Sequence, residues 1–315
     1  MPTHHLWPPR TTGLVLQPRD LEVLRFVVNH RFLRSDHLQA LMTTRMPWRV
    51  MQARLQKLSR HGYLRRLYVP VVLDGVHAPL THSRQPIYTL DTRGVQVLRE
   101  RAPPGTPAAA LDRPERPSYH FLSHHLVVTD CLVALAAATR SIPAVEVVEV
   151  WPESTLWVKL RAYRREHRLP RALIPDGAFT LRYPSTGETI TFYLEVVRAD
   201  VKHGNQQLLA KLRRYIELNR QGILRAVYGH ERVRAVLWAT TSTARARNLA
   251  ALAGQLPQGR RLFWFGAYQG QTTTGALAST FTPERLLHLP WLDGGGTTWT
   301  LLNPTARPPL DEGHS

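Results

Sequence analysis

The sequence has few of the features that mark secreted, membrane-spanning or cysteine-rich metal proteins. Cys131 is the single cysteine among 315 residues, which excludes an internal disulfide and any zinc site built from several cysteines. No apolar run approaches the roughly 20 residues that span a bilayer. The first ten residues lack the apolar centre of a signal peptide. We therefore expect a cytoplasmic protein without a membrane partner.

Acidic residues are also scarce. The chain has 23 Asp and Glu against 41 Lys and Arg, a net charge of +18, which points to a polyanionic partner. Nucleic acid and an anionic membrane surface are the usual candidates, and the lack of a membrane segment favours DNA. Nearly all the basic residues are arginine, whose forked side chain suits phosphate and guanine. A G·C-rich genome produces the same bias, so the arginine content alone decides nothing.

The length and the positions of proline predict two domains. A domain usually takes about 100–200 residues, and residues 102–117 form a Pro- and Ala-rich stretch typical of a linker. We expect a flexible arm at 1–16, a first domain at 17–101, a second at 118–302 and a flexible tail at 303–315.

The first domain has a helical pattern three times before it becomes strand-like. Apolar residues recur at helical spacing in three segments, and Gly62 follows the third as a typical helix-ending residue. Two strand-like runs then flank a loop at 74–85, and Thr92 begins a fourth helix. The expected helices cover about 18–30, 35–41 and 47–61, and the expected strands cover 63–72 and 86–90. This order is typical of a winged helix-turn-helix.

The third expected helix and its lead-in carry basic and amide side chains opposite the apolar face. Residues 17–68 contain eleven basic and three acidic residues, a clustering that phosphate binding requires. Arginine pairs with guanine and glutamine with adenine in the major groove. A solvated helix face and a protein-binding winged helix are the alternatives. The predicted DNA-binding residues are Arg45, Trp48, Arg49, Gln52, Gln56, Lys57 and Arg60.

The second domain alternates between helical and strand-like segments. Helices are expected at 118–139, 204–220 and 243–254, and strands at 144–151, 155–160, 177–183, 189–197, 233–240 and 261–267. This alternation predicts an α/β sheet with helices on its faces.

Two carboxylates stand out in that sheet. Asp176 opens one expected strand and Glu195 lies inside the next, with a turn between them, so strand pairing can bring them together. Two adjacent carboxylates can hold Mg²⁺ against a phosphate. Asp also commonly starts a turn, and Arg198 or Lys211 can neutralise a buried Glu195. The sequence alone leaves both interpretations open.

The histidines and the cysteine of the expected 118–139 helix have a simpler explanation. His120 and His124 share a face of that helix, but His125 points away from them and no third ligand is evident. We expect core or hydrogen-bonding roles for these histidines, and a core position for Cys131.

The arrangement of Asp176 and Glu195 resembles the PD-(D/E)xK nuclease superfamily. The resemblance implies that both acids bind metal and that a lysine two residues after the glutamate activates water. Val197 stands at that position. Lys211, on the following helix, is the candidate replacement, since a lysine moved onto a helix is a variant within the superfamily. The candidate catalytic residues are therefore Asp176, Glu195 and Lys211.

The whole chain resembles the replication-relaxation family of plasmid and mobile-element proteins. The matching stretches are Ile87–Leu90 before Arg93-Gly94, His124–Leu126 with Asp130, Leu173–Asp176, Tyr193–Val196 and Lys211–Tyr215. The resemblance implies a winged helix joined to a restriction-endonuclease-like domain, and a role in plasmid replication and DNA relaxation beside replication or conjugation proteins. The family commonly has an acid where Val197 stands.

Because of Val197, we expect DNA binding with a degenerate nuclease-like domain rather than an enzyme. The alternatives are a Mg²⁺-dependent nuclease or nickase that uses Asp176 and Glu195, and a winged-helix transcriptional regulator. A homodimer that reads two half-sites is compatible with the sequence.

Overall fold

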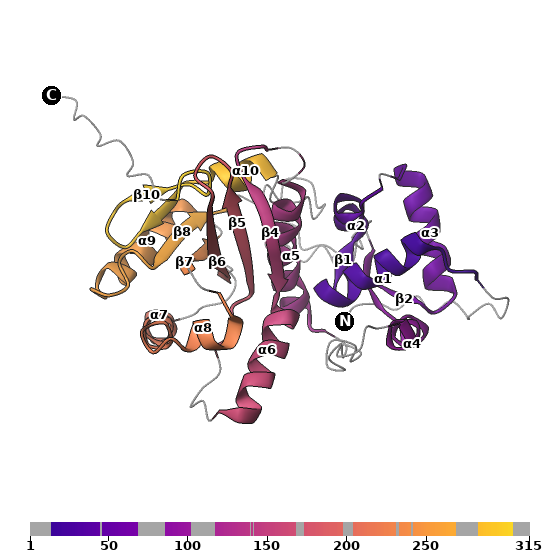
Figure 1. Ribbon diagram of the computed structural model, residues 1–315, viewed down its shortest axis with the longest axis horizontal. Helices are drawn as coiled ribbons and strands as arrows, with labels where there is room; N and C mark the ends of the chain where they lie inside the picture. Colours follow the sequence, from indigo (N-terminus) through magenta and orange to yellow (C-terminus); the bar gives the residue numbers. More distant parts are fainter. Residues whose placement is uncertain are drawn as a thin grey trace, which may run out of the picture. The chain divides into compact units, whose positions relative to one another are not determined.

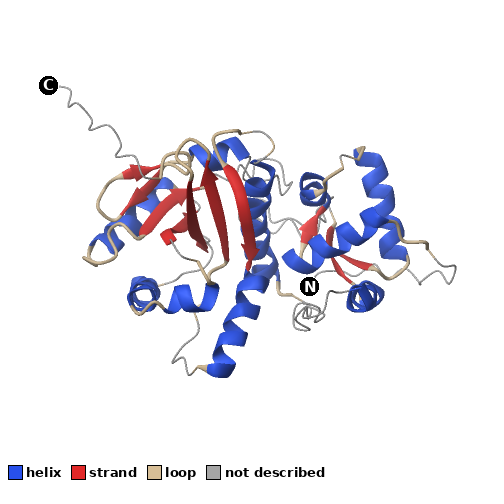
Figure 2. Ribbon diagram, in the orientation of Figure 1, coloured by secondary structure: helices blue, strands red, loops and turns tan. Residues whose placement is uncertain are grey.

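The computed structural model describes residues 14–44, 46–68, 86–101, 117–138, 140, 142–167, 173–197, 204–230, 233–240, 242–268 and 283–304. Helices and strands are mixed throughout (Figure 2), which confirms the expected α/β class. The described chain forms two compact units that meet in sequence at Val133 and Ala134. In the described part, no helix has both the length and the apolar character needed to cross a bilayer.

The first unit combines short helices with a small antiparallel sheet. Its elements are α1 (Pro18–His30), β1 (Leu33–Arg34), α2 (Ser35–Leu41), α3 (Trp48–Arg60), β2 (Leu64–Leu67), β3 (Ile87–Leu90) and α4 (Thr92–Arg101). The strands pair in the order β1-β3-β2. The three expected helices and the fourth are present. The strand expected at 63–72 is observed as the four residues of β2, and residues 69–72 and the loop 74–85 lie outside the described residues.

An ion pair fixes α3 against α1. The backbone N–H of Gln17 donates to Asp20 Oδ2 at 2.7 Å, which caps the start of α1. Asp20 is fully buried and also accepts from Arg54 of α3, with Nε 2.7 Å from Oδ1 and Nη2 bonded to Oδ2. Arg54 is therefore held in an ion pair within the protein, although the sequence counts it among the basic residues of this segment.

The junction between α3 and α4 depends on two glycines. Gly62 follows α3 with φ +74°, the left-handed conformation that favours glycine. Gly94, in the first turn of α4, lies so close to the chain that an added Cβ atom would be 2.2 Å from the carbonyl oxygen of Tyr63. These glycines let α4 pack directly on the backbone that leaves α3.

A buried ionic cluster joins α2 to α5 (Tyr119–Ala138), whose residues up to Val133 belong to the first unit. The Arg34 side chain is fully buried, and its Nη2 lies 2.5 Å from Asp130 Oδ1. Arg34 Nε also bonds Asp36 at 3.0 Å. Burial alone raises the pKa of Asp130, but the Arg34 charge and His37 outweigh it and lower that pKa.

The same cluster fixes the proton position on His37. The backbone N–H of Arg34 donates to His37 Nδ1 at 3.2 Å, so Nδ1 carries no proton. Nε2 therefore bears the proton of the neutral ring and donates to Asp130 Oδ1 at 2.6 Å. Residues about 95 positions apart in sequence are thus locked together by directional bonds.

The second unit is built on a seven-stranded sheet with the order β10-β9-β8-β7-β6-β5-β4. The central strands β6, β7 and β8 are parallel, and the other neighbours are antiparallel. The strands are β4 (Glu146–Pro152), β5 (Gly177–Tyr183), β6 (Glu188–Val197), β7 (Val233–Thr240), β8 (Phe263–Ala267), β9 (Trp291–Asp293) and β10 (Thr298–Trp299).

Helices cover one face of this sheet with a continuous apolar core. Leu156, Leu212 and Leu249 come from three different helices and pack with Tyr193 and Trp238 of the strands. The helices of this unit after α5 are α6 (Glu153–Glu166), α7 (Asn205–Arg220), α8 (Ile223–Tyr228), α9 (Thr243–Gly254) and α10 (Pro283–His288). In Figure 1 three of these helices, α6, α7 and α8, lie together beside the sheet.

The strand predicted at 155–160 is wrong, because α6 occupies these residues. Thr155, Trp157 and Val158 favour strands by propensity, but Leu156 and Leu160 lie four apart and both are buried. Their helical spacing and the packing against β4 and β5 decide the conformation. The short elements β1, α8, α10, β9 and β10 were not predicted.

One of the two edge strands of the described sheet is β4, and the other is β10. The pairing of β4 with β5 shifts register between Val147 and Glu149, which marks a bulge. Val148 is 47% exposed at this bulge, Glu149 is exposed, and β4 ends at Pro152. These features interrupt the regular edge of the sheet.

Removing the Asp130 carboxylate should destabilise the first unit. Asp130→Ala leaves the fully buried Arg34 without its main counter-charge, and breaking such a pair costs about 3–5 kcal/mol. Urea denaturation of the full chain measures the loss.

Glu146→Ala is the matched control. Glu146 pairs with Arg182 where both side chains are 42–50% exposed, so its removal should change stability by about 0–1 kcal/mol. Equal effects of the two substitutions would show that the buried cluster does not stabilise the unit.

Candidate functional site

Helix α3 separates its apolar and polar residues as the sequence predicts. Met51, Leu55 and Leu58 are buried on one face. On the opposite face Arg49, Gln52 and Lys57 are exposed, and Gln56 and Arg60 are half-buried. Trp48, at the first position of the helix, is half-buried, and Arg45 lies outside the described residues. The outward face is therefore basic and rich in hydrogen-bond donors.

The two predicted carboxylates are neighbours at the β5–β6 pair. Gly177 pairs with Leu194, so Asp176, just before β5, lies beside Glu195. Asp176 Oδ2 accepts a hydrogen bond of 2.7 Å from the backbone N–H of Val196. The antiparallel register is what brings together two acids that are 19 positions apart in sequence.

Glu195 is held by two donors from α7. Its Oε2 atom lies 2.5 Å from Lys211 Nζ, and its Oε1 atom accepts from the Tyr215 hydroxyl at 2.5 Å. Lys211 and Tyr215 are four residues apart, so they leave the same face of α7 one turn from each other. The sequence predicts that Lys211 lies near Glu195. It does not indicate Tyr215, apart from the position of that residue one helical turn after Lys211.

Burial and neighbouring charges shift the pKa values of Glu195, Lys211 and Tyr215. The Glu195 side chain is 2% exposed. Burial raises the pKa of Glu195 from 4.5 to about 7; Lys211 opposes this rise and the nearby Asp176 adds to it. Burial lowers the pKa of Lys211, but Glu195 and Asp176 outweigh that effect and raise it. Burial and Glu195 together raise the pKa of Tyr215 well above its usual value.

The cluster already contains its own cation. Magnesium is usually bound by one or two carboxylates together with several waters, so a magnesium ion here would compete with Lys211 for Glu195. Both Glu195 oxygens accept from α7, and the Lys211 ammonium already lies at ion-pair distance from the carboxylate. Among the described residues, no group of three or more His, Cys, Asp and Glu is placed to hold a metal ion. The internal cation is lysine.

Val197 is a second difference from the nuclease superfamily. Alternation along β6 directs Tyr193, Glu195 and Val197 to the same face of the sheet. Val197 is 4% exposed and packs in the apolar core with Leu208 and Leu212 of α7. The position at which the nuclease superfamily has lysine therefore supplies only hydrophobic contact.

His125 and Cys131 of α5 pack and bond within the protein interior. His125 Nε2 bonds the carbonyl oxygen of His30 at 2.5 Å, and its ring stacks on Phe121. Cys131 is fully buried, and burial raises the pKa of its thiol. The side chain of His120 lies outside the described residues. A buried, protonated thiol is a poor nucleophile.

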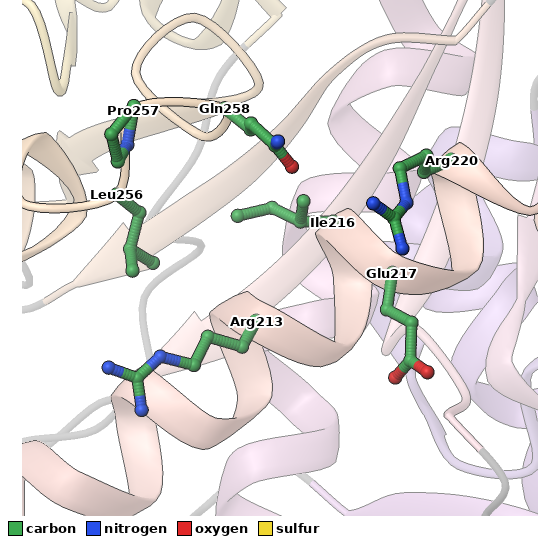
Figure 3. Close-up of a pocket in the computed structure, with 7 residues that line it drawn as sticks. All are labelled: Arg213, Ile216, Glu217, Arg220, Leu256, Pro257 and Gln258. Carbon is green, nitrogen blue, oxygen red and sulfur yellow. The ribbon is translucent and has the colours of Figure 1, made fainter.

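A pocket of about 300 Å³ lies on the side of α7 away from Glu195. Its walls combine the helix with the segment that follows α9 (Figure 3). Glu217 in this pocket pairs with Arg214 at 2.7 Å. None of the residues predicted from the sequence lines it. The lining residues are Arg213, Ile216, Glu217, Arg220, Leu256, Pro257 and Gln258.

Comparison with known families identifies the chain's relatives. The family model described as replication-relaxation matches residues 24–233, two thirds of the chain. The chain belongs to the replication-relaxation family. The match runs from α1 to the first residue of β7, so it includes the polar face of α3 and the Glu195 cluster. Membership supports involvement in plasmid or mobile-element replication or relaxation. Searches of curated proteins and of solved structures gave no match.

The raised pKa of Glu195 predicts a pH-dependent stability in this replication-relaxation protein. The folded state holds the Glu195 proton up to about pH 7, whereas the unfolded chain releases it near 4.5. Stability contributed by this group is therefore complete below about pH 4.5 and falls by about 3 kcal/mol as the pH rises to 7. Glu195→Gln cannot ionise, so its free energy of unfolding in urea should rise by about 3 kcal/mol relative to wild type between pH 4.5 and 7. His30 and His230, whose lowered pKa values give the opposite pH dependence, contribute equally to both proteins and cancel in this difference.

Glu217→Gln is the control on the same helix, because Glu217 is 46% exposed and leaves Glu195 intact. The control should keep the wild-type slope between pH 4.5 and 7. An unchanged slope in Glu195→Gln would assign the pH dependence to another group.

Proposed function

We propose that this protein binds duplex DNA through α3 of a winged helix-turn-helix in its first unit. The observation that carries the proposal is the outward face of α3, where Arg49, Gln52 and Lys57 are exposed while the opposite face is buried. Arginine and glutamine read guanine and adenine edges, and lysine contacts phosphate. The replication-relaxation family supports a partner of this kind.

The topology of the first unit supports the same assignment. Three helices precede the antiparallel β2–β3 pair, and β3 also pairs with the short β1. A winged helix-turn-helix has this order, with its recognition helix before the strands. The Arg54–Asp20 ion pair and the Arg34–Asp130 cluster stabilise the helices from inside, which leaves the outer face of α3 for a ligand.

The second unit, in this proposal, is a nuclease-like domain that no longer cleaves. Its sheet carries Asp176 and Glu195 side by side, as a nuclease requires, but Lys211 and Tyr215 occupy the Glu195 oxygens. Val197 lies in the core. The unit then contributes structure and additional contacts rather than hydrolysis.

Arg49→Ala should weaken duplex binding. Loss of a bidentate base contact costs about 1–3 kcal/mol, which is about 5- to 150-fold in Kd. A preferred duplex is first selected from a random-sequence pool, and binding is then measured by fluorescence anisotropy.

Arg99→Ala is the control, since Arg99 is also an exposed arginine of the first unit but lies on α4. It should bind within about two-fold of wild type, as expected for a charge outside the DNA contact surface. Equal losses in both variants would mean that only overall charge matters and that α3 is not the reading element.

A plasmid assay tests the absence of cleavage. With Mg²⁺, the wild-type protein should leave supercoiled DNA intact, because Glu195 is committed to Lys211 and Tyr215. Asp176→Ala should behave identically. Mg²⁺-dependent conversion to open circles that disappears in Asp176→Ala would instead establish a nickase.

A further inference from the structure

Helix α6 presents a second polar surface, in the second unit. Its inner side is apolar, with Leu156 and Leu160 buried in the core of the unit. Trp157, Arg161 and Arg165 follow one another at intervals of four residues on the outer side, and all three are exposed. Figure 1 shows the C-terminal end of α6 extending past the ends of the strands.

Trp157 is the unusual member of this surface. It is 38% exposed and is the one aromatic residue among the large exposed hydrophobic side chains of the described chain. The guanidinium of Arg161 lies 5.9 Å from its ring centroid, which is a cation–π distance. Leu156 and Leu160 anchor the inner side of the helix, so the exposed part of the Trp157 ring is available to a ligand.

The arginines beside Trp157 have no acidic partners in the part of the chain that the structure describes. Arg161, Arg164 and Arg165 are exposed, and none forms an ion pair there. Lys159, on the same helix, behaves differently. Its Nζ lies 3.6 Å from the centroid of the Trp151 ring and donates to the carbonyl of Tyr228 at 3.3 Å. The outward charge of α6 around Trp157 is therefore mainly arginine, with Glu166 as an exposed acid at the last position of the helix.

We propose that this α6 stripe, Trp157 with Arg161, Arg164 and Arg165, binds single-stranded DNA. Trp157 stacks on an unpaired base and the arginines contact the phosphates on either side. Bases in a duplex are already stacked on each other, so an exposed aromatic ring selects unpaired strands. The stripe extends over about 12 Å of helix, enough for neighbouring nucleotides. The inference rests on the proposed DNA-binding function, but it uses a surface other than α3.

The test uses the full chain and a labelled oligo-dT of about 20 nucleotides, a length that covers a typical single-strand site. Binding is followed by fluorescence anisotropy at several salt concentrations. Trp157→Ala should weaken binding by about 10-fold or more, whereas Trp157→Phe, which keeps an aromatic face, should stay within a few-fold. Arg161→Gln with Arg165→Gln should reduce the salt slope by about 1.4, since each lost phosphate contact on a single strand removes about 0.7.

The matched control changes the same amount of charge elsewhere in the second unit. Arg225 of α8 and Arg247 of α9 are both exposed, and their double change to Gln should leave oligo-dT binding at wild-type affinity. Thermal melting of each variant confirms that it folds. Arg49→Ala separates this inference from the proposed function, because it should weaken duplex binding and leave oligo-dT binding unchanged.

Three results would overturn the inference. The first is wild-type affinity for oligo-dT in both the Trp157→Ala and the arginine variants, or no binding by the wild type. The second is tighter binding to oligo-U than to oligo-dT, which would make the partner RNA. In the third, Trp157→Ala loses binding to vesicles of anionic phospholipid but not to oligo-dT, which would make the stripe a membrane-contacting surface.

Discussion

A carboxylate buried in the middle of a sheet dictates how the second unit is assembled. Burying the polar oxygens of Glu195 beneath α7 is costly unless donors reach both of them. Lys211 and Tyr215 supply them from consecutive turns, which sets both the rotation of α7 and its height on the sheet. The apolar residues of α7 then fall over Tyr193 and Val197. In the first unit Arg34 and Asp130 apply the same constraint to α5.

The longer elements of the fold were predictable because their patterns are repeated over many residues. The spacing of apolar residues gave α1, α3, α7 and α9 within a few positions, and strand-like runs gave β5, β6, β7 and β8. Residues 155–160 were predicted wrongly because strand propensity there opposes helical spacing. Elements such as β1 and β10, each two residues long, exist only through their partners in the sheet and leave no local pattern.

The candidate site was predictable in its members but not in their bonds. An acid in an apolar strand and a lysine on the next helix identified Glu195 and Lys211, yet nothing in the sequence shows which oxygen each donor takes. Counting charge could not distinguish Arg54, which is paired inside with Asp20, from Arg49, which faces outward. The link between Arg34 and Asp130 spans 96 positions and depends on tertiary packing alone.

The irregular edge at β4 limits how copies of this protein can associate. A free strand edge normally invites another chain to add a strand. At β4 the bulge breaks the repeat of donors and acceptors, the exposed Glu149 places a charge on the strand, and Pro152 lacks an N–H. At this edge the described sheet therefore ends in a strand to which a second copy cannot easily add a strand of its own.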